Sequence, residues 1–390
     1  MRKKRSKDHI LRKLMVSLIF LAIGFLAGFI VAGAGGYFQL PGYAPVLIFI
    51  LTFFVSLVVH EMGHFISFVT DGVKMRALYL SAFLFITENG RWTLKFRPNS
   101  MTLIGGLVVP DVGVIEDEHN FQKMQKAYAR AIIAGPVASI FLWLVSVIII
   151  ISFFLGSGSL SAAWLVYLGS LTVITLLIIV SSMFQTEAFV GDFPAYKLCK
   201  NDRFFAAMQL YQYVLLSSEP EKIRRQNTYL KEVLLNELAE KYGKREVHVF
   251  TLNIIDAFLV EYLVGETEEL PPVVSDYITY LVDKPQVLSR LKNSEIALLL
   301  RAHIIRLLSA QENTKELALD FYQALKRDIE PVNPVKKYII RQTEHVLGLA
   351  DHGEYLQNKA NIIISPAHDV LKNFPGYYMD ELKLNHSTQH

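Results

Sequence analysis

Two long stretches of this chain contain no Asp, Glu, Lys or Arg. They cover residues 14–60 and 131–186, and each is long enough for two membrane spans at about 20 residues per span. Glycine and proline interrupt the first stretch at 35–36 and 41–42, and a Gly-Ser run interrupts the second at 156–159. The pattern therefore predicts four transmembrane helices, near residues 14–36, 44–69, 131–154 and 162–186.

Basic residues indicate how these spans are oriented. Seven lie in the first thirteen positions and eight more between residues 71 and 130, whereas the short connections at 36–43 and 156–161 carry none. By the positive-inside rule, both termini and the 71–130 loop are expected in the cytoplasm, which an even number of spans allows. A cleaved signal peptide is the alternative for the first span, but the apolar stretch is long for one and lacks a convincing cleavage site. We therefore expect an integral protein of the plasma membrane.

Beyond residue 195 the chain is more polar, and its apolar residues recur every three or four positions, which predicts amphipathic helices. Proline-containing breaks separate the segments. The predicted helices cover residues 203–217, 222–242, 247–264, 273–283, 294–309, 314–327 and 335–349. Their similar lengths would suit a helical-repeat module, although no repeat consensus is present. Such a domain would bind a substrate tail or a regulatory protein, or would stabilise the membrane part.

The 71–130 loop contains a second kind of pattern. Two β-prone runs at 77–87 and 92–97 flank Asn89-Gly90, and Asn-Gly between such runs is a strong hairpin signal. Our hypothesis is that this hairpin pairs with an extended substrate by strand addition. The alternative is a hairpin that lies on the membrane surface.

The expected fold class is an all-α membrane protein with a small cytoplasmic β-hairpin insertion. Its parts are a basic cytoplasmic tail (1–13), a transmembrane domain (14–195) and a cytoplasmic helical domain (196–390). Composition agrees: 52% of the residues are hydrophobic, 19% are charged and the net charge is +3. These values speak against a soluble enzyme, a disordered chain and a nucleic-acid-binding protein. The single cysteine, Cys199, excludes a disulfide framework and a thiolate metal cage, so histidines and carboxylates remain as metal ligands.

The second predicted span contains the sequence His60-Glu61-Met62-Gly63-His64. Residues four apart share a helix face, so both imidazoles can bind one zinc ion while Glu61, on the adjoining surface, reaches a water molecule on the metal. Zinc polarises a scissile carbonyl and lowers the pKa of its water, and the carboxylate takes the proton. Because ionisable groups are costly inside a bilayer, their presence indicates a functional site.

A catalytic zinc ion needs a third protein ligand at a similar depth. The run 185–194 closes the fourth predicted span on the same side of the membrane and contains two carboxylates. We prefer Asp192, because Gly191 allows close backbone approach and Pro194 can end or redirect the helix beyond the ligand. Glu187 is the alternative ligand.

These residues resemble the site-2 protease family, intramembrane zinc metallopeptidases that cut transmembrane or membrane-bound proteins. The matching features are His60-Glu61-x-x-His64 in one span, Ala134-Gly135-Pro136 opening the next, and Gly191-Asp192 after a third. The resemblance covers residues 43 to about 195, and it implies His60, His64 and Asp192 as zinc ligands and Glu61 as general base.

The chain departs from the family pattern in two places. The family usually has Asn and Pro leading into Leu-Asp-Gly, whereas Asp192 here is preceded by Gly191 and followed by Phe193. Ser139 stands where the motif that begins at Ala134 often ends in Asn, so a hydrogen bond behind the ligands can differ. We expected Pro136 in the first turn of the third span, where proline is tolerated, and Gly135 at a close helix contact.

We therefore expect an intramembrane zinc metalloendopeptidase with one Zn²⁺ ion. Its expected partners are a membrane protein or peptide substrate, the lipid bilayer and a protein bound at the C-terminal helical domain, but no nucleic acid. Two other classes stay open, a divalent-metal transporter and a non-catalytic scaffold of protease descent. A transporter would usually show inverted repeats and helix breaks at mid-membrane, and the sequence shows no sign of either. An intact Glu61 argues against the scaffold.

Overall fold

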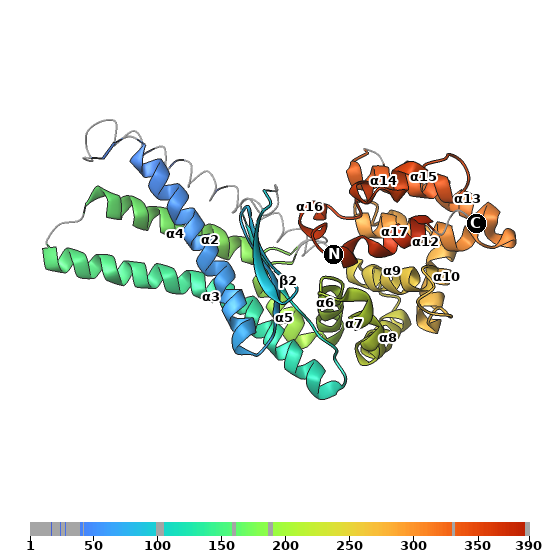
Figure 1. The fold of residues 1–390 in the computed structure, drawn as a ribbon, viewed down its shortest axis with the longest axis horizontal. Helices are drawn as coiled ribbons and strands as arrows, with labels where there is room; N and C mark the ends of the chain where they lie inside the picture. The colour runs from blue at the N-terminus through green and yellow to red at the C-terminus, as the bar shows by residue number, and fades with distance from the viewer. Residues whose placement is uncertain are drawn as a thin grey trace. The chain divides into compact units, whose positions relative to one another are not determined.

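The computed structural model describes residues 40–41, 43–98, 105–157, 161–185, 190–329 and 332–386, with three isolated positions nearer the N-terminus. The basic tail and nearly all of the first predicted span lie outside these residues. The chain divides into two compact units (Figure 1). The first unit comprises Met1–Pro110 and Gln122–Asn201, and the second comprises Asp111–Phe121 and Asp202–His390.

Among the described residues, three helices are long and apolar enough to cross a membrane, which makes the chain an integral membrane protein. They are α2 (Ala44–Thr70), α3 (Glu118–Ser157) and α4 (Ala162–Ser182), and they confirm three of the four predicted spans. Helix α2 packs along α4 (Figure 1). Helix α3 begins well before residue 131, because a polar segment that favours helix continues the apolar span. Helix α4 ends at Ser182 rather than near 186.

Pro136 lies in the interior of α3, so its prediction in a first turn was wrong. Proline lacks the backbone N–H that would bond to the carbonyl four residues earlier, which weakens the helix at this turn. The helix nevertheless continues to Ser157. The polar segment before Pro136 and the long apolar segment after it both favour helix.

A four-stranded antiparallel sheet follows α2, where the sequence predicted one hairpin. Its strands are β1 (Met75–Leu80), β2 (Phe83–Glu88), β3 (Arg91–Phe96) and β4 (Gly106–Pro110), in the order β3-β2-β1-β4. Asn89 and Gly90 join β2 to β3 with φ values of 50° and 75°, which suit a type I′ turn and confirm the hairpin. The run 77–87 is not one strand, because Ser81 adopts a φ of 54° and reverses the chain.

The two edges of the sheet have different surroundings. Strands β1 and β4 contact α2, and β1 is buried along its whole length. Strand β3, at the opposite edge, is largely exposed. The sheet therefore places β4, its other edge strand, beside the helix that carries the histidine motif.

The second unit is helical, and the helices predicted from periodicity are present. They are α6 (Arg203–Leu215), α7 (Pro220–Gln226), α8 (Thr228–Gly243), α9 (Val249–Leu263), α10 (Pro272–Asp283), α12 (Glu295–Ser309), α13 (Lys315–Asp328) and α14 (Pro334–Val346). The predicted helix 222–242 is divided at Asn227, whose side chain accepts a hydrogen bond from the amide of Ile115 and donates one to the carbonyl of Gly113. Short helices follow, among them α17 (Met379–His386).

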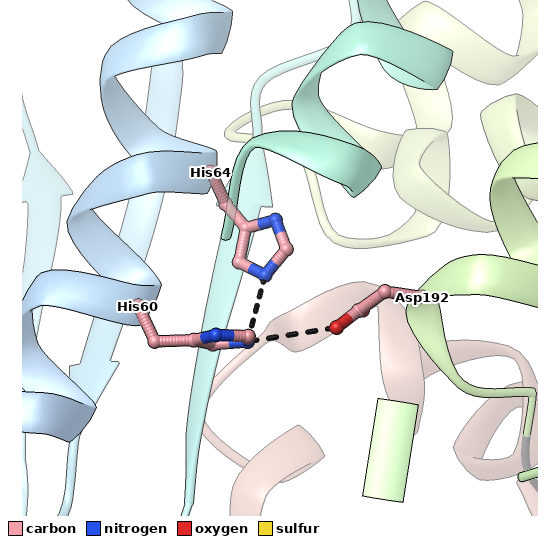
Figure 2. A group of neighbouring side chains, drawn as sticks. All are labelled: His60, His64 and Asp192. Atoms are coloured by element: carbon pink, nitrogen blue, oxygen red, sulfur yellow. Dashed lines mark hydrogen bonds and ion pairs between the residues drawn. The ribbon is translucent and has the colours of Figure 1, made fainter. Parts of the chain in front are cut away.

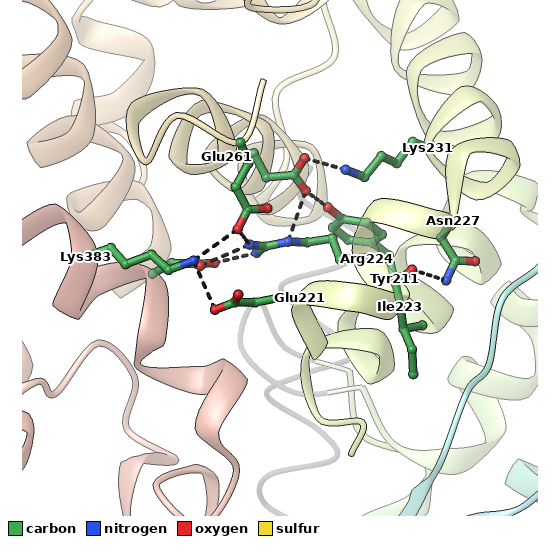
Figure 3. A network of polar contacts seen from close by, with 10 residues as sticks. Tyr211, Glu221, Ile223, Arg224, Asn227, Lys231, Glu261 and Lys383 are labelled. Atoms are coloured by element: carbon green, nitrogen blue, oxygen red, sulfur yellow. Dashed lines mark hydrogen bonds and ion pairs between the residues drawn. The ribbon is translucent and has the colours of Figure 1, made fainter. Parts of the chain in front are cut away.

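Two buried charged networks hold α17 in the second unit. Arg224 lies at the centre of the first network, near Glu261 and Lys383 (Figure 3). It forms ion pairs with Asp380 and, at 2.6 Å, with Glu266. The imidazole of His303 lies between two carboxylates, 2.7 Å from Asp256 and 3.0 Å from Glu381. Because a buried charge is tolerated only when it is paired, each network depends on residues of α17.

Candidate metal centre

His60 and His64 lie one turn apart on α2 and extend their rings toward the same point (Figure 2). Their Nε2 atoms are 3.2 Å apart. His60 is buried, with 9% of its surface exposed, and His64 is half-buried. This is the arrangement that the four-residue spacing predicts for a helix.

Helix α3 determines which ring nitrogen of each histidine faces the shared point. Nδ1 of His64 lies 2.7 Å from the carbonyl oxygen of Ala131, which can only accept, so Nδ1 carries the proton. Nδ1 of His60 lies 3.0 Å from the hydroxyl of Ser139, which itself donates to the carbonyl of Gly135. Both Nε2 atoms therefore present their lone pairs to the same point, as ligands of one cation do.

Asp192 is the first residue of α5 (Asp192–Asn201), a helix that we did not predict, and it faces His60 (Figure 2). Its Oδ2 atom lies 3.5 Å from Nε2 of His60 and accepts a 2.7 Å hydrogen bond from the hydroxyl of Ser182, at the end of α4. Pro194 lies in the first turn of α5, so it opens a helix instead of ending one. Ser182 was missed in the sequence, because nothing in its neighbourhood marks it as a partner of residue 192.

Two glycines permit the close approach of these elements. A Cβ atom at Gly135 would lie 2.2 Å from Nε2 of His64, and one at Gly191 would lie 2.6 Å from the carbonyl oxygen of Ser182. Gly191 also donates a backbone hydrogen bond of 2.7 Å to Phe184. A larger residue at Gly135 would displace the His64 ring, and one at Gly191 would displace the backbone that leads into Asp192.

The three side chains match the donor set of a zinc site. One ligand atom from each of His60, His64 and Asp192 lies within 4.8 Å of the other two. Two nitrogens bound tetrahedrally to zinc at 2.0–2.1 Å are separated by about 3.3 Å, close to the observed separation of the histidine nitrogens. Two imidazoles and a carboxylate also leave a fourth position for a reactant. The residues present therefore fit zinc.

Glu61 follows His60 on α2 and is 7% exposed. Its carboxylate is thus buried, and it interacts electrostatically with His60 and Asp192. Glu187, the alternative third ligand, lies outside the described residues.

Comparison with known protein families assigns this chain to a peptidase family. The profile described as peptidase family M50 matches residues 48–364, which is most of the chain. Comparison with curated proteins and with solved structures gives no significant match. The chain therefore belongs to peptidase family M50, the site-2 protease family of zinc-dependent metallopeptidases.

Proposed function

We propose that this metallopeptidase is an intramembrane endopeptidase in which His60, His64 and Asp192 hold one Zn²⁺ ion and Glu61 is the general base. The observation that carries the proposal is the convergence of these four side chains. Three candidate ligand atoms lie within 4.8 Å of one another, and two of them belong to a helix apolar enough to cross a membrane. The buried Glu61 lies on the same helix and interacts electrostatically with His60 and Asp192. Such groups are costly in a bilayer unless they have a function.

The protein's own residues have distinct tasks in this reaction. When bound, the zinc ion supplies Lewis acidity toward the scissile carbonyl and lowers the pKa of the attacking water. Glu61 accepts the proton of that water and passes it to the leaving amine. Ser139 and the carbonyl of Ala131 hold the two imidazole rings, and Ser182 holds Asp192, so the ligands are oriented before a substrate binds.

Among the described strands β4 pairs with β1 alone, and its other edge is the proposed binding place for an extended substrate, in place of the β2–β3 hairpin. Leu80 and Gly106 face each other across β1 and β4, and the amide of Ser81 bonds to the carbonyl of Gly105 at 3.3 Å. This is the pattern of a non-hydrogen-bonded antiparallel pair, so the N–H and C=O groups of Gly106 and Val108 point away from β1. A substrate strand added there would run beside α2.

The β2–β3 hairpin has a different proposed role. The register of the hairpin places Phe83, Trp92, Leu94 and Phe96 on one face, and all four are exposed. A cluster of exposed aromatic and aliphatic side chains on a membrane protein suits contact with lipid. We assign this hairpin to the membrane surface, which leaves β4 as the substrate edge.

The proposed topology follows from the basic residues. The protein lies in the plasma membrane with both termini in the cytoplasm. The helical domain (196–390) binds a substrate tail or a regulatory protein, and the cleaved product is released into the cytoplasm. Substrates are regulatory or precursor membrane proteins, because the site lies among candidate spans and peptidases act on peptide bonds.

Metal content and cleavage test this function together. The purified chain is expected to contain one zinc ion and to cleave members of a library of single transmembrane peptides in detergent micelles. Glu61→Gln should keep the zinc and lose cleavage, Asp192→Ala should lose both, and Glu187→Ala should keep both. A wild-type protein without zinc, or a fully active Glu61→Gln, would refute the proposal. Metal flux into vesicles that changes with Glu61→Gln would favour the transporter.

A further inference from the structure

Gly106, the first residue of β4, lies directly against the side chain of Glu61. A Cβ atom added to Gly106 would lie 2.3 Å from Cγ, 2.4 Å from Cδ and 2.7 Å from Oε1 of Glu61. All three distances are below 3.0 Å, a separation that Cβ atoms essentially never show. Any residue larger than glycine must therefore displace either this strand or the carboxylate of Glu61.

The strand has little freedom to retreat. Gly106 is held opposite Leu80 of β1, and the next residues on β4 are packed, with Val108 6% and Val109 0% exposed. Glu61 also cannot move far as a whole, because it lies in the middle of α2, which contacts both strands. The more adaptable part of this contact is the Glu61 side chain, because its rotamers interconvert more readily than packed backbone moves.

We propose that Gly106 is a positioning residue of the peptidase, and this rests on the proposed role of Glu61 as general base. Because Gly106 has no side chain, its backbone can lie directly against Glu61 and restrict the positions that the Glu61 carboxylate can take. A general base must stay within hydrogen-bond reach of the proton that it takes. Displacing a catalytic group by about 1 Å can reduce the rate about a hundredfold, so one methyl group at position 106 is sufficient to impair catalysis.

A double-mutant cycle on melting temperature tests the contact without any substrate. Gly106→Ala should lower the melting temperature of the full-length protein in detergent by several degrees. In a Glu61→Ala background the same substitution should have almost no effect, because the three atoms that the new methyl group meets are gone. Gly113→Ala is the matched control, since an added Cβ there meets nothing within 4 Å. An equal loss in both backgrounds would show that Gly106 does not press on Glu61.

Kinetics test the catalytic consequence. With the best-cleaved peptide of the transmembrane library, Gly106→Ala should reduce kcat about a hundredfold and change KM little, while zinc content stays equal to wild type. A raised KM with an unchanged kcat would assign Gly106 to substrate binding and overturn its positioning role. A fully active Gly106→Ala would also overturn it.

The two proposals fail in distinguishable ways. If Glu61→Gln cleaves normally, the general-base assignment fails, while the thermal cycle still reports whether Gly106 presses on Glu61. If Glu61→Gln is inactive and Gly106→Ala is not, the general base stands and the positioning inference is wrong.

Discussion

The hydroxyl of Ser139 lies 3.0 Å from Nδ1 of His60, on the opposite side of the ring from the nitrogen that faces Asp192. Ser139 also bonds to the carbonyl of Gly135 within α3, so its lone pair is directed toward the imidazole. Ser139, which is not itself a proposed metal ligand, thereby determines which ring nitrogen of His60 carries the proton.

Ser139→Ala should weaken zinc binding without unfolding the protein. Losing the partner of a metal-ligating histidine typically reduces metal affinity about ten- to hundredfold. Competition with a chelator of known affinity measures the change. Ser146→Ala, on the same helix but bonded to Tyr167, is the control and should leave zinc affinity unchanged. Equal affinities for wild type and Ser139→Ala would disprove this role.

Gly135→Ala should exclude zinc by steric means. The new methyl carbon would lie 2.2 Å from Nε2 and 2.4 Å from Cε1 of His64, so the ring must leave its position. The zinc content of the purified variant, measured by mass spectrometry, should fall well below one ion per chain. Gly156→Ala, also in α3 but with nothing within 4 Å of the added carbon, should retain a full complement. A fully loaded Gly135→Ala would contradict the proposed ligand geometry.

Val108→Pro should impair substrate binding at the β4 edge while the β1–β4 ladder stays intact. Proline removes an N–H that points away from β1, and a backbone hydrogen bond contributes about 1 kcal/mol, so kcat/KM should fall about fivefold or more. Leu94→Pro, on the exposed β3 edge, is the counterpart and should cleave normally. Zinc content and melting temperature check that either variant is folded. If Leu94→Pro alone loses activity, the substrate edge is β3.

The His303 network predicts how the stability of the second unit depends on pH. Burial alone lowers the pKa of His303, but the carboxylates of Asp256 on α9 and Glu381 on α17 raise it, to about 10. Tyr338 and Arg306 also interact with Glu381. A folded-state pKa above the ordinary value of 6.5 stabilises the fold fully below that pH, and the contribution disappears as pH rises toward 10.

As the pH rises from 6.5 to 9, the contribution of His303 to the free energy of unfolding should therefore fall, by at most about 1.4 kcal/mol per pH unit. Hydrogen exchange of peptides from α12 and α17, corrected for the intrinsic rate, measures the opening free energy. His303→Gln should be less stable at pH 6.5 and much less sensitive to pH. An equally steep decline in wild type and His303→Gln would assign the pH dependence to another group.

The sequence allowed the elements with strong local signals to be predicted. Helix α2 is revealed by its long uncharged stretch, and the β2–β3 turn by Asn89-Gly90, whose residues adopt positive φ readily. The spacing of His60 and His64 was sufficient to predict that their rings converge, because helix geometry is local.

The remaining features depend on contacts that are distant in the sequence. Ser81 reverses the chain inside the β-prone run 77–87, where no glycine marks a turn. Asn227 divides a predicted helix because its side chain bonds to Ile115. Ser182 and Gly106 belong to the surroundings of the site only because α4 and β4 fold back onto it. Neither hydrophobic periodicity nor a short motif in a single sequence predicts these contacts.

The position of α17 has a consequence for how this protein is made. Asp380 and Glu381 each supply one of the carboxylates around Arg224 and His303, so these residues must leave the ribosome before either buried network is complete. The second unit can therefore complete its folding only after residue 381 has been made, by which time the candidate membrane helices, which precede it in the chain, have already been synthesised. A chain that stops shortly before residue 380 would leave Arg224 with Glu266 and His303 with Asp256 as remaining carboxylate partners, so each buried cation would be only partly neutralised and the second unit should be less stable.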